Sequence, residues 1–423
     1  MLQKLKDKIL SSEFSKNVIT LMSGTVLAQF IPFIFAPILS RIYSPTDFGR
    51  LALYLSIIQI LGAIANGRYE LAIVLPESNR KAKYLTLLSV LISFALSILS
   101  FFIIFLFSDQ LSILLGDKSI KKWLFLIPIS IIFIGVFNAL NYYNIRHKRF
   151  NNIAKAQINR SLFGNILQLI LRYISTNGGL IIGQVFSHLL GNIKLINIFP
   201  YKTIRINKLT YTGIVAVSKE YIDFPKFTLW GIFMNVLSTN MTNIIISKWY
   251  NLSSVGFYSI AFKYLGVPSG VIGNSIGQVY FQKISENKHN EEFVLKIFKE
   301  TLLKLFIIGG GIFLITFFIV EDLFIVYLGD QWSIAGTYSK ILIPLFFIRF
   351  LVSPLSMTNV ALERQKVSLF CHSVILLTHI ITFIIGYYCR YNLESFIKSL
   401  SLNLSLSYTF LLFVIFLVVK RKI

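Results

Sequence analysis

Apolar residues recur in long runs along the whole chain, and short polar stretches separate these runs. A helix that crosses a lipid bilayer needs about 20 mostly apolar residues, and about twelve segments reach that length. Strands of a membrane barrel would instead alternate apolar and polar positions, whereas 85–107 is a continuous run without a charge. The pattern therefore predicts an all-α polytopic membrane protein. The predicted spans are 17–39, 51–75, 84–107, 123–144, 153–173, 178–198, 226–247, 254–282, 300–320, 336–360, 367–388 and 396–419.

The composition supports a membrane protein and argues against several other classes. Hydrophobic residues make up 55% of the 423 residues and charged residues only 14%, whereas soluble domains carry about 25% charged residues. The net charge of +23 would suggest nucleic acid in a soluble protein, but Lys, Asn, Ile and Phe are all abundant, which indicates general compositional bias. We expect no nucleic-acid partner.

Catalytic and metal-binding patterns find no support in the sequence. The two cysteines and five histidines have no metal-ligand spacing, and the triple glycine at 309–311 lacks the Lys-Ser/Thr of a phosphate-binding loop. The sequence therefore predicts a protein that is not an enzyme and that needs no metal or cofactor.

The distribution of basic residues predicts the orientation. With the N-terminus in the cytoplasm, 24 Lys and Arg residues fall in cytoplasmic loops and tails and 8 fall on the opposite side. Cytoplasmic loops of membrane proteins carry such an excess of Lys and Arg. We therefore expect both termini in the cytoplasm and an even number of spans.

A basic loop divides the chain into halves that resemble each other. Sliding the sequence by 207 residues pairs 38–43 with 245–250 and Gly49 with Gly256 without a gap. Parallel repeats of this kind build transporters with a path between two bundles. The prediction is two six-helix lobes around a central cavity. The predicted segments are a cytoplasmic lead (1–16), an N-lobe (17–198), a cytoplasmic linker (199–225), a C-lobe (226–419) and a cytoplasmic tail (420–423).

Three basic residues stand out within predicted spans: Arg68, Lys263 and Arg349. Charges inside a membrane are costly and usually face a water-filled cavity or a partner. One hypothesis is a cationic lumen that holds a phosphate or diphosphate, for which the planar fork of Arg is well suited. The alternatives are an ion pair between Arg68 and Glu70, or side chains that reach to the membrane interface. Glu70 is itself either a site of ion coupling or the structural partner of Arg68.

The seventh predicted span is unusually polar. Asn235, Thr239 and Asn243 recur at every fourth position and so share one helix face. They predict the lining of a sugar path together with Gln29 of the first span, although small polar residues also mediate helix packing.

Two motifs resemble one membrane protein family. Ser40-Arg41-Ile42-Tyr43-Ser44-Pro45-Thr46-Asp47-Phe48-Gly49 resembles the first periplasmic turn of bacterial polysaccharide and O-antigen flippases, and 68–76 resembles the end of their second span. These flippases belong to the multidrug/oligosaccharidyl-lipid/polysaccharide exporter superfamily. The second half has no comparably sharp match.

The resemblance implies a two-lobed transporter with alternating access in the bacterial inner membrane. It implies an undecaprenyl-diphosphate-linked oligosaccharide, of O-antigen or capsule type, as the substrate. It further implies an ion gradient as the energy source, and glycan polymerase machinery is a candidate partner besides the lipid bilayer.

Two other function classes stay open from the sequence. A multidrug/cation antiporter of the same superfamily should carry acidic groups in its lumen, whereas basic residues outnumber acidic ones inside these spans. A membrane-embedded glycan polymerase or ligase should carry a large outer loop, whereas the longest loop is assigned here to the cytoplasm.

Overall fold

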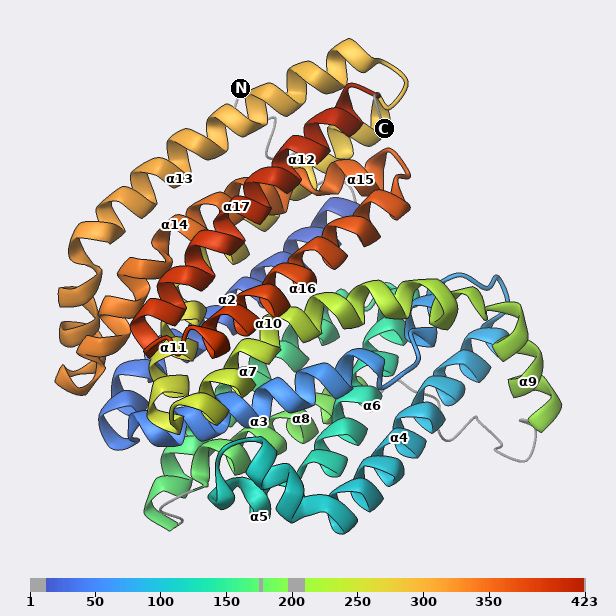
Figure 1. The fold of residues 1–423 in the computed structure, drawn as a ribbon. Coiled ribbons are helices and arrows are strands. Elements are labelled where there is room, and N and C mark those ends of the chain that lie inside the picture. Colours follow the sequence, from blue (N-terminus) through green and yellow to red (C-terminus); the bar gives the residue numbers. More distant parts are fainter. Residues whose placement is uncertain (1–12, 175–177, 197–209, 422–423) are drawn as a thin grey trace. The chain divides into compact units, whose positions relative to one another are not determined.

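A computed structural model describes residues 13–174, 178–196 and 210–421. All regular elements in this part of the chain are helical, which confirms the predicted all-α class. The chain forms two compact units (Figure 1): unit 1 takes its described residues from 1–43 and 53–233, and unit 2 from 44–52 and 234–423. Most of the predicted lead, the first part of the predicted linker and the last two residues of the tail lie outside the described residues.

The first half of the chain alternates long helices with short turns. Its elements are α2 (Glu13–Ile42), α3 (Pro45–Ile64), η1 (Tyr69–Val74), α4 (Asn79–Leu114), η2 (Lys118–Ile120), α5 (Lys121–Leu124), α6 (Ile127–Arg146), α7 (Phe150–Ile174), α8 (Gly179–Ile196), α9 (Tyr211–Glu220) and η4 (Phe224–Thr228). Within unit 1, α7 packs between α2 and α8, and α4 packs on α6.

The second half follows with the same kind of elements. They are α10 (Leu229–Trp249), α11 (Leu252–Leu265), η5 (Ser269–Gly273), α12 (Asn274–Glu286), α13 (Glu291–Leu328), η6 (Asp330–Trp332), α14 (Ser333–Leu355), α15 (Met357–Ala361), α16 (Gln365–Tyr388) and α17 (Leu393–Val419). Within unit 2, α14 lies beside α11, α13 and α17 (Figure 1).

Eleven helical segments of the described chain are long and apolar enough to cross a membrane, so the protein is a multi-pass membrane protein. The predicted fifth span corresponds to α7, a 25-residue helix that is too polar for that criterion. The total of twelve spans stays a prediction.

Two predicted spans differ from the structure in their internal form. The predicted span 51–75 ends as an α-helix at Ile64, and a turn and the short helix η1 follow it. Two consecutive residues with left-handed backbone, Gly67 and Arg68, cause this break, because an α-helix cannot continue through positive φ values. The predicted span 254–282 is divided by the π-helical turn η5 into α11 and α12.

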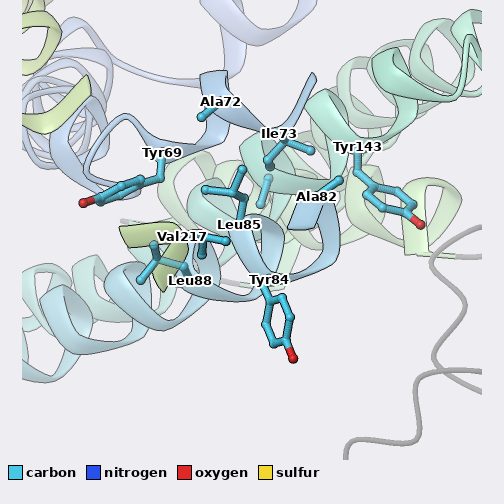
Figure 2. Close-up of a cluster of buried hydrophobic side chains, with 10 residues drawn as sticks. Tyr69, Ala72, Ile73, Ala82, Tyr84, Leu85, Leu88, Tyr143 and Val217 are labelled. Atoms are coloured by element: carbon cyan, nitrogen blue, oxygen red, sulfur yellow. The ribbon is translucent and has the colours of Figure 1, made fainter. Parts of the chain in front are cut away.

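A cluster of buried side chains fixes η1 to the rest of unit 1 (Figure 2). Tyr69, Ala72 and Ile73 of η1 contact a set that comes from α4, α6 and α9. The remaining members are Ala82, Tyr84, Leu85, Leu88, Ala139, Tyr143 and Val217. Burial of this apolar surface holds η1 and the turn before it in place; the turn carries Arg68, and η1 carries Glu70.

The helix boundaries agree with the repeat register. Helices α2 and α10 end at Ile42 and Trp249, and α3 and α11 begin at Pro45 and Leu252, so both pairs keep the offset of 207. Each following helix also has a side-chain N-cap, which satisfies backbone N–H groups at a helix start. Asn251 Oδ1 accepts a hydrogen bond from the Ser254 backbone N–H at 2.8 Å, and the equivalent Ser44 Oγ accepts one from Asp47 at 3.2 Å.

Candidate anion-binding residues

Arg68 and Glu70 form an ion pair in unit 1, with Arg68 Nη1 and Glu70 Oε1 3.2 Å apart. Their side chains are only 17% and 4% exposed. The pair lies in the turn and the short helix between α3 and α4. The prediction that these residues lie inside a spanning helix is therefore wrong. Burial raises the pKa of the Glu70 carboxyl, and the charge of Arg68 opposes that shift. Of the predicted alternatives, the pairing of these two residues is the one that the structure contains.

Asn66 joins this turn to two neighbouring helices through its side-chain hydrogen bonds. Its side-chain amide donates to the carbonyl oxygens of Ser89 at 3.1 Å and Gly135 at 2.9 Å, and its Oδ1 accepts from Asn138 at 3.2 Å. Asn66 is itself buried. The turn is therefore tied to both α4 and α6, so the position of Arg68 is determined by the packing of three elements.

Arg349 lies in α14 among aromatic rings of unit 2. Its guanidinium carbon is 5.3 Å from the ring centre of Phe262 on α11 and 5.7 Å from that of Phe346. Among the described residues no carboxylate forms an ion pair with it. Aromatic faces attract a cation but do not neutralise it, so Arg349 keeps a full charge to offer to an anion.

Lys263 follows Phe262 on α11, and its side chain is exposed. It too has no ion-pair partner in the described part of the chain. Because α11 and α14 pack against each other, the structure places two uncompensated cations, Lys263 and Arg349, on neighbouring helices of one unit. Arg68 belongs to the other unit.

The polar positions of α10 differ in burial. Ser238, Asn240 and Thr242 are buried, whereas Asn235 is exposed and Thr239 and Asn243 are half-buried. The predicted lining positions are therefore more accessible than these three buried polar positions. Gln29 of α2 is also exposed. A lining role for these residues stays a prediction.

Sequence reasoning missed a second cation of unit 1, Arg160 of α7. Its Nη2 lies 3.2 Å from Nε2 of His188 on α8. Arg160 is ten residues from the start of α7 and His188 nine from the start of α8. Consecutive membrane spans are antiparallel, so residues near the middle of the predicted spans 153–173 and 178–198 can meet. That signal could have marked Arg160 as a charge inside a predicted span, although not His188 as its neighbour.

Comparison with known proteins identifies the family of this chain. The family model described as "Polysaccharide biosynthesis protein" matches residues 38–336. The chain belongs to this polysaccharide biosynthesis protein family. The match includes both sequence motifs, so the resemblance they suggested is confirmed at the level of the family. No group of three or more His, Cys, Asp or Glu that could hold a metal ion occurs among the described residues.

Two relatives of this polysaccharide biosynthesis protein are named for the transport or the synthesis of a glycan. The succinoglycan biosynthesis transport protein ExoT of Rhizobium meliloti (strain 1021) is 23% identical over 62% of this chain and 52% of its own length. The teichuronic acid biosynthesis protein TuaB of Bacillus subtilis (strain 168) is 24% identical over 38% of this chain and 33% of its own. The matches thus span about half or less of these relatives.

Solved structures show the same fold. The lipid II flippase MurJ in an inward closed conformation has a TM-score of 0.70 at 19% identity and covers 96% of this chain and 90% of its own. An inward-facing multidrug resistance MATE family transporter has a TM-score of 0.71 at 11% identity, with 95% and 94% covered. At these identities the likeness concerns the fold of this polysaccharide biosynthesis protein.

Proposed function

We propose that this protein is a flippase that moves a lipid-linked oligosaccharide across the bacterial inner membrane. The observation that carries the proposal is the pair of uncompensated cations, Lys263 and Arg349, on neighbouring helices of a multi-pass protein. A charge within a membrane span is retained where it serves a ligand or a path. A diphosphate linker between lipid and sugar is an anion that Arg pairs with through two parallel hydrogen bonds.

The family supports this substrate class. Membership in the polysaccharide biosynthesis protein family ties the protein to glycan synthesis, and a related sequence is named as a transport protein of succinoglycan biosynthesis. The proposal includes undecaprenyl diphosphate as the carrier, movement from the cytoplasmic to the outer leaflet, both termini in the cytoplasm and coupling to an ion gradient. The proposed path of the sugars would be lined by Asn235, Thr239, Asn243 and Gln29. The predicted coupling role of Glu70 and the polymerase partner stay predictions.

The decisive experiment measures flipping by the purified protein in lipid vesicles. The vesicles carry a fluorescent undecaprenyl-diphosphate-linked oligosaccharide, and a sugar-binding reagent outside them reports arrival in the outer leaflet. The variant Arg349→Gln should lose about tenfold or more of the initial rate, because a hydrogen bond to a charged group contributes about 1.5–3 kcal/mol. Lys263→Gln should act in the same direction.

A matched control lies on the same helix. Lys340 of α14 pairs with Glu321, with Nζ and Oε2 3.3 Å apart, so Lys340→Gln removes the same charge type from a compensated position. Its flipping rate should stay within about twofold of the unsubstituted protein, as exposed ion pairs contribute little. The proposal is wrong if Arg349→Gln and Lys340→Gln flip equally well, or if vesicles accumulate a cationic dye while leaving the lipid-linked sugar in place.

A further inference from the structure

The centre of α7 carries a cation without a counter-charge in its surroundings. Arg160 is half-buried, and its guanidinium carbon lies 5.3 Å from the ring centre of Phe137 on α6. No carboxylate of the described residues forms an ion pair with it. Unit 1 thus contains two half-buried arginines that differ in their surroundings: Arg68 pairs with an acid, whereas Arg160 pairs with none of the described residues.

His188 lies beside Arg160 and Gln184 in a cluster of nitrogen-bearing side chains. It is 3% exposed, and its Nε2 lies 3.2 Å from Arg160 Nη2 and 3.4 Å from Nε2 of Gln184. The guanidinium and the amide nitrogen can only donate hydrogen bonds, so the imidazole Nε2 must accept them and its hydrogen lies on Nδ1. This Nδ1 is buried and has no hydrogen-bond partner. The cluster therefore has more donors than acceptors.

Close packing of α7 against α8 holds this cluster in place. Gly164 lies against Ser187, whose Cβ would be 2.8 Å from an added side-chain carbon, and Gly191 lies against Arg160, whose Cβ would be 3.2 Å from one. Such small residues let membrane helices approach closely. Arg160 is thus fixed at its backbone, while the remaining nitrogens of its guanidinium have no protein partner among the described residues.

An anion would satisfy both the positive charge and the surplus hydrogen-bond donors of this cluster. A charge buried among packed helices is unfavourable unless an opposite charge reaches it, and a surplus donor buried without an acceptor is costly as well. We propose that Arg160, His188 and Gln184 form an anion-binding site of unit 1, and that its ligand is the phosphate group of the transported lipid. The oxyanion follows from the fork of the guanidinium, which pairs with two oxygens at once. The choice of the lipid phosphate, though not the anion site, rests on the proposed function.

The test measures anion binding by the purified full chain in detergent, independently of transport. Isothermal titration calorimetry is carried out in the Lys263→Gln/Arg349→Gln background, which removes the two proposed anion-binding residues of unit 2 from the measurement. The probes are inorganic diphosphate, inorganic phosphate and chloride, each at constant ionic strength. In this background diphosphate should bind, and Arg160→Gln should weaken its binding at least about tenfold, whereas Arg160→Lys should retain part of it, because Lys keeps the charge but not the fork.

Further variants separate a binding role from a structural one. Lys155→Gln removes a charge from an exposed position of the same helix and should leave the dissociation constant within about twofold. If Arg160→Gln does not yield a monodisperse protein, His188→Gln and Gln184→Ala decide instead: both keep the arginine, and both should weaken diphosphate binding.

Three outcomes would overturn the inference. Diphosphate binding that is unchanged by Arg160→Gln, or by His188→Gln and Gln184→Ala together, removes the site. Chloride binding that depends on Arg160 while neither phosphate nor diphosphate binds assigns the site to a halide instead. Vesicle flipping that survives Arg160→Gln at an unchanged rate excludes the lipid phosphate as the ligand. Arg160-dependent diphosphate binding by a protein that flips nothing would retain the anion site and refute the proposed function.

Discussion

The two ends of α3 show what the internal repeat has kept and what it has not. The first residues of α3 belong to unit 2 and the rest to unit 1. At its start, Gly49 packs on the backbone of Leu252 and the equivalent Gly256 packs on that of Pro45, so each helix meets the other through matching positions. After its end, Arg68 and Glu70 form their ion pair, whereas the positions 207 residues later are Ser275 and Gly277 of α12.

The difference teaches which features a repeat constrains. A helix crossing at backbone distance admits only glycine, so both copies had to keep it. Charged side chains beyond the crossing have no such constraint, and the halves differ there. Unit 1 neutralises Arg68 with an acid, whereas no acid among the described residues pairs with Lys263 or Arg349 of unit 2. We therefore propose a structural role for Arg68 and Glu70 and ligand binding for Lys263 and Arg349.

Gly49→Ala should cause the largest loss of stability, because it disrupts the close contact between the starts of α3 and α11. The new Cβ would overlap the carbonyl oxygen of Leu252 and lie 2.8 Å from its carbon. Backbone atoms inside a helix cannot retreat, so we expect a loss of more than about 3 kcal/mol, at the upper end of overpacking. Thermal unfolding in detergent measures it. Gly310→Ala is the control, because nothing lies within 4 Å of the new Cβ there; an equal loss in both would contradict the crossing.

The next effect tests the other end of α3. Glu70→Ala leaves Arg68 buried without its counter-charge, and removal of one partner of a buried pair costs about 3 kcal/mol. Glu70→Gln keeps an oxygen that can accept a hydrogen bond from Arg68 and should lose clearly less. Equal stability of Glu70→Ala and the unsubstituted protein would mean that the pair has no structural role and would return Glu70 to the candidates for ion coupling.

Glu70 also predicts a dependence of stability on pH. Its pKa in the folded protein is raised above the ordinary value of 4.5, chiefly by burial. Between these two values the folded state binds more protons than the unfolded state, so stability falls as the pH rises through that range. Glu70→Gln should remove this contribution. Unfolding temperatures measured from pH 4 upward would contradict the assignment if the two proteins follow parallel curves.

The sequence predicted the features of the fold that depend on periodicity and length. Apolar runs placed the helices, and the register of the repeat predicted the equivalent ends of α2 and α10. It did not predict the break after Ile64, because a non-glycine residue with left-handed backbone, Arg68, leaves no signature in hydropathy. It also missed Arg160 and His188, whose partnership arises only when α7 and α8 pack. Charges within spans are visible in a sequence, but their partners are not.

A smaller effect concerns the backbone at Arg68, which has a φ of 65°. A non-glycine residue in this left-handed region is strained by about 1 kcal/mol or more. Arg68→Gly and Arg68→Ala both remove the ion pair, but Gly also relieves the strain. We expect the Gly variant to be more stable than the Ala variant by about 1 kcal/mol in thermal unfolding. The reverse order would show that the turn relaxes once the ion pair is gone.

The smallest effect returns to the start of α3. The hydroxyl oxygens of Thr46 and Ser253 lie 2.7 Å apart, and these two residues are again equivalent in the repeat. Thr46→Val removes this partly buried hydrogen bond and keeps the shape of the side chain, so the expected loss is about 1 kcal/mol or less. A double-mutant cycle with Ser253→Ala isolates the pair. If the two losses simply add, the hydroxyls do not interact in the folded protein, and the crossing depends on Gly49 and Gly256 alone.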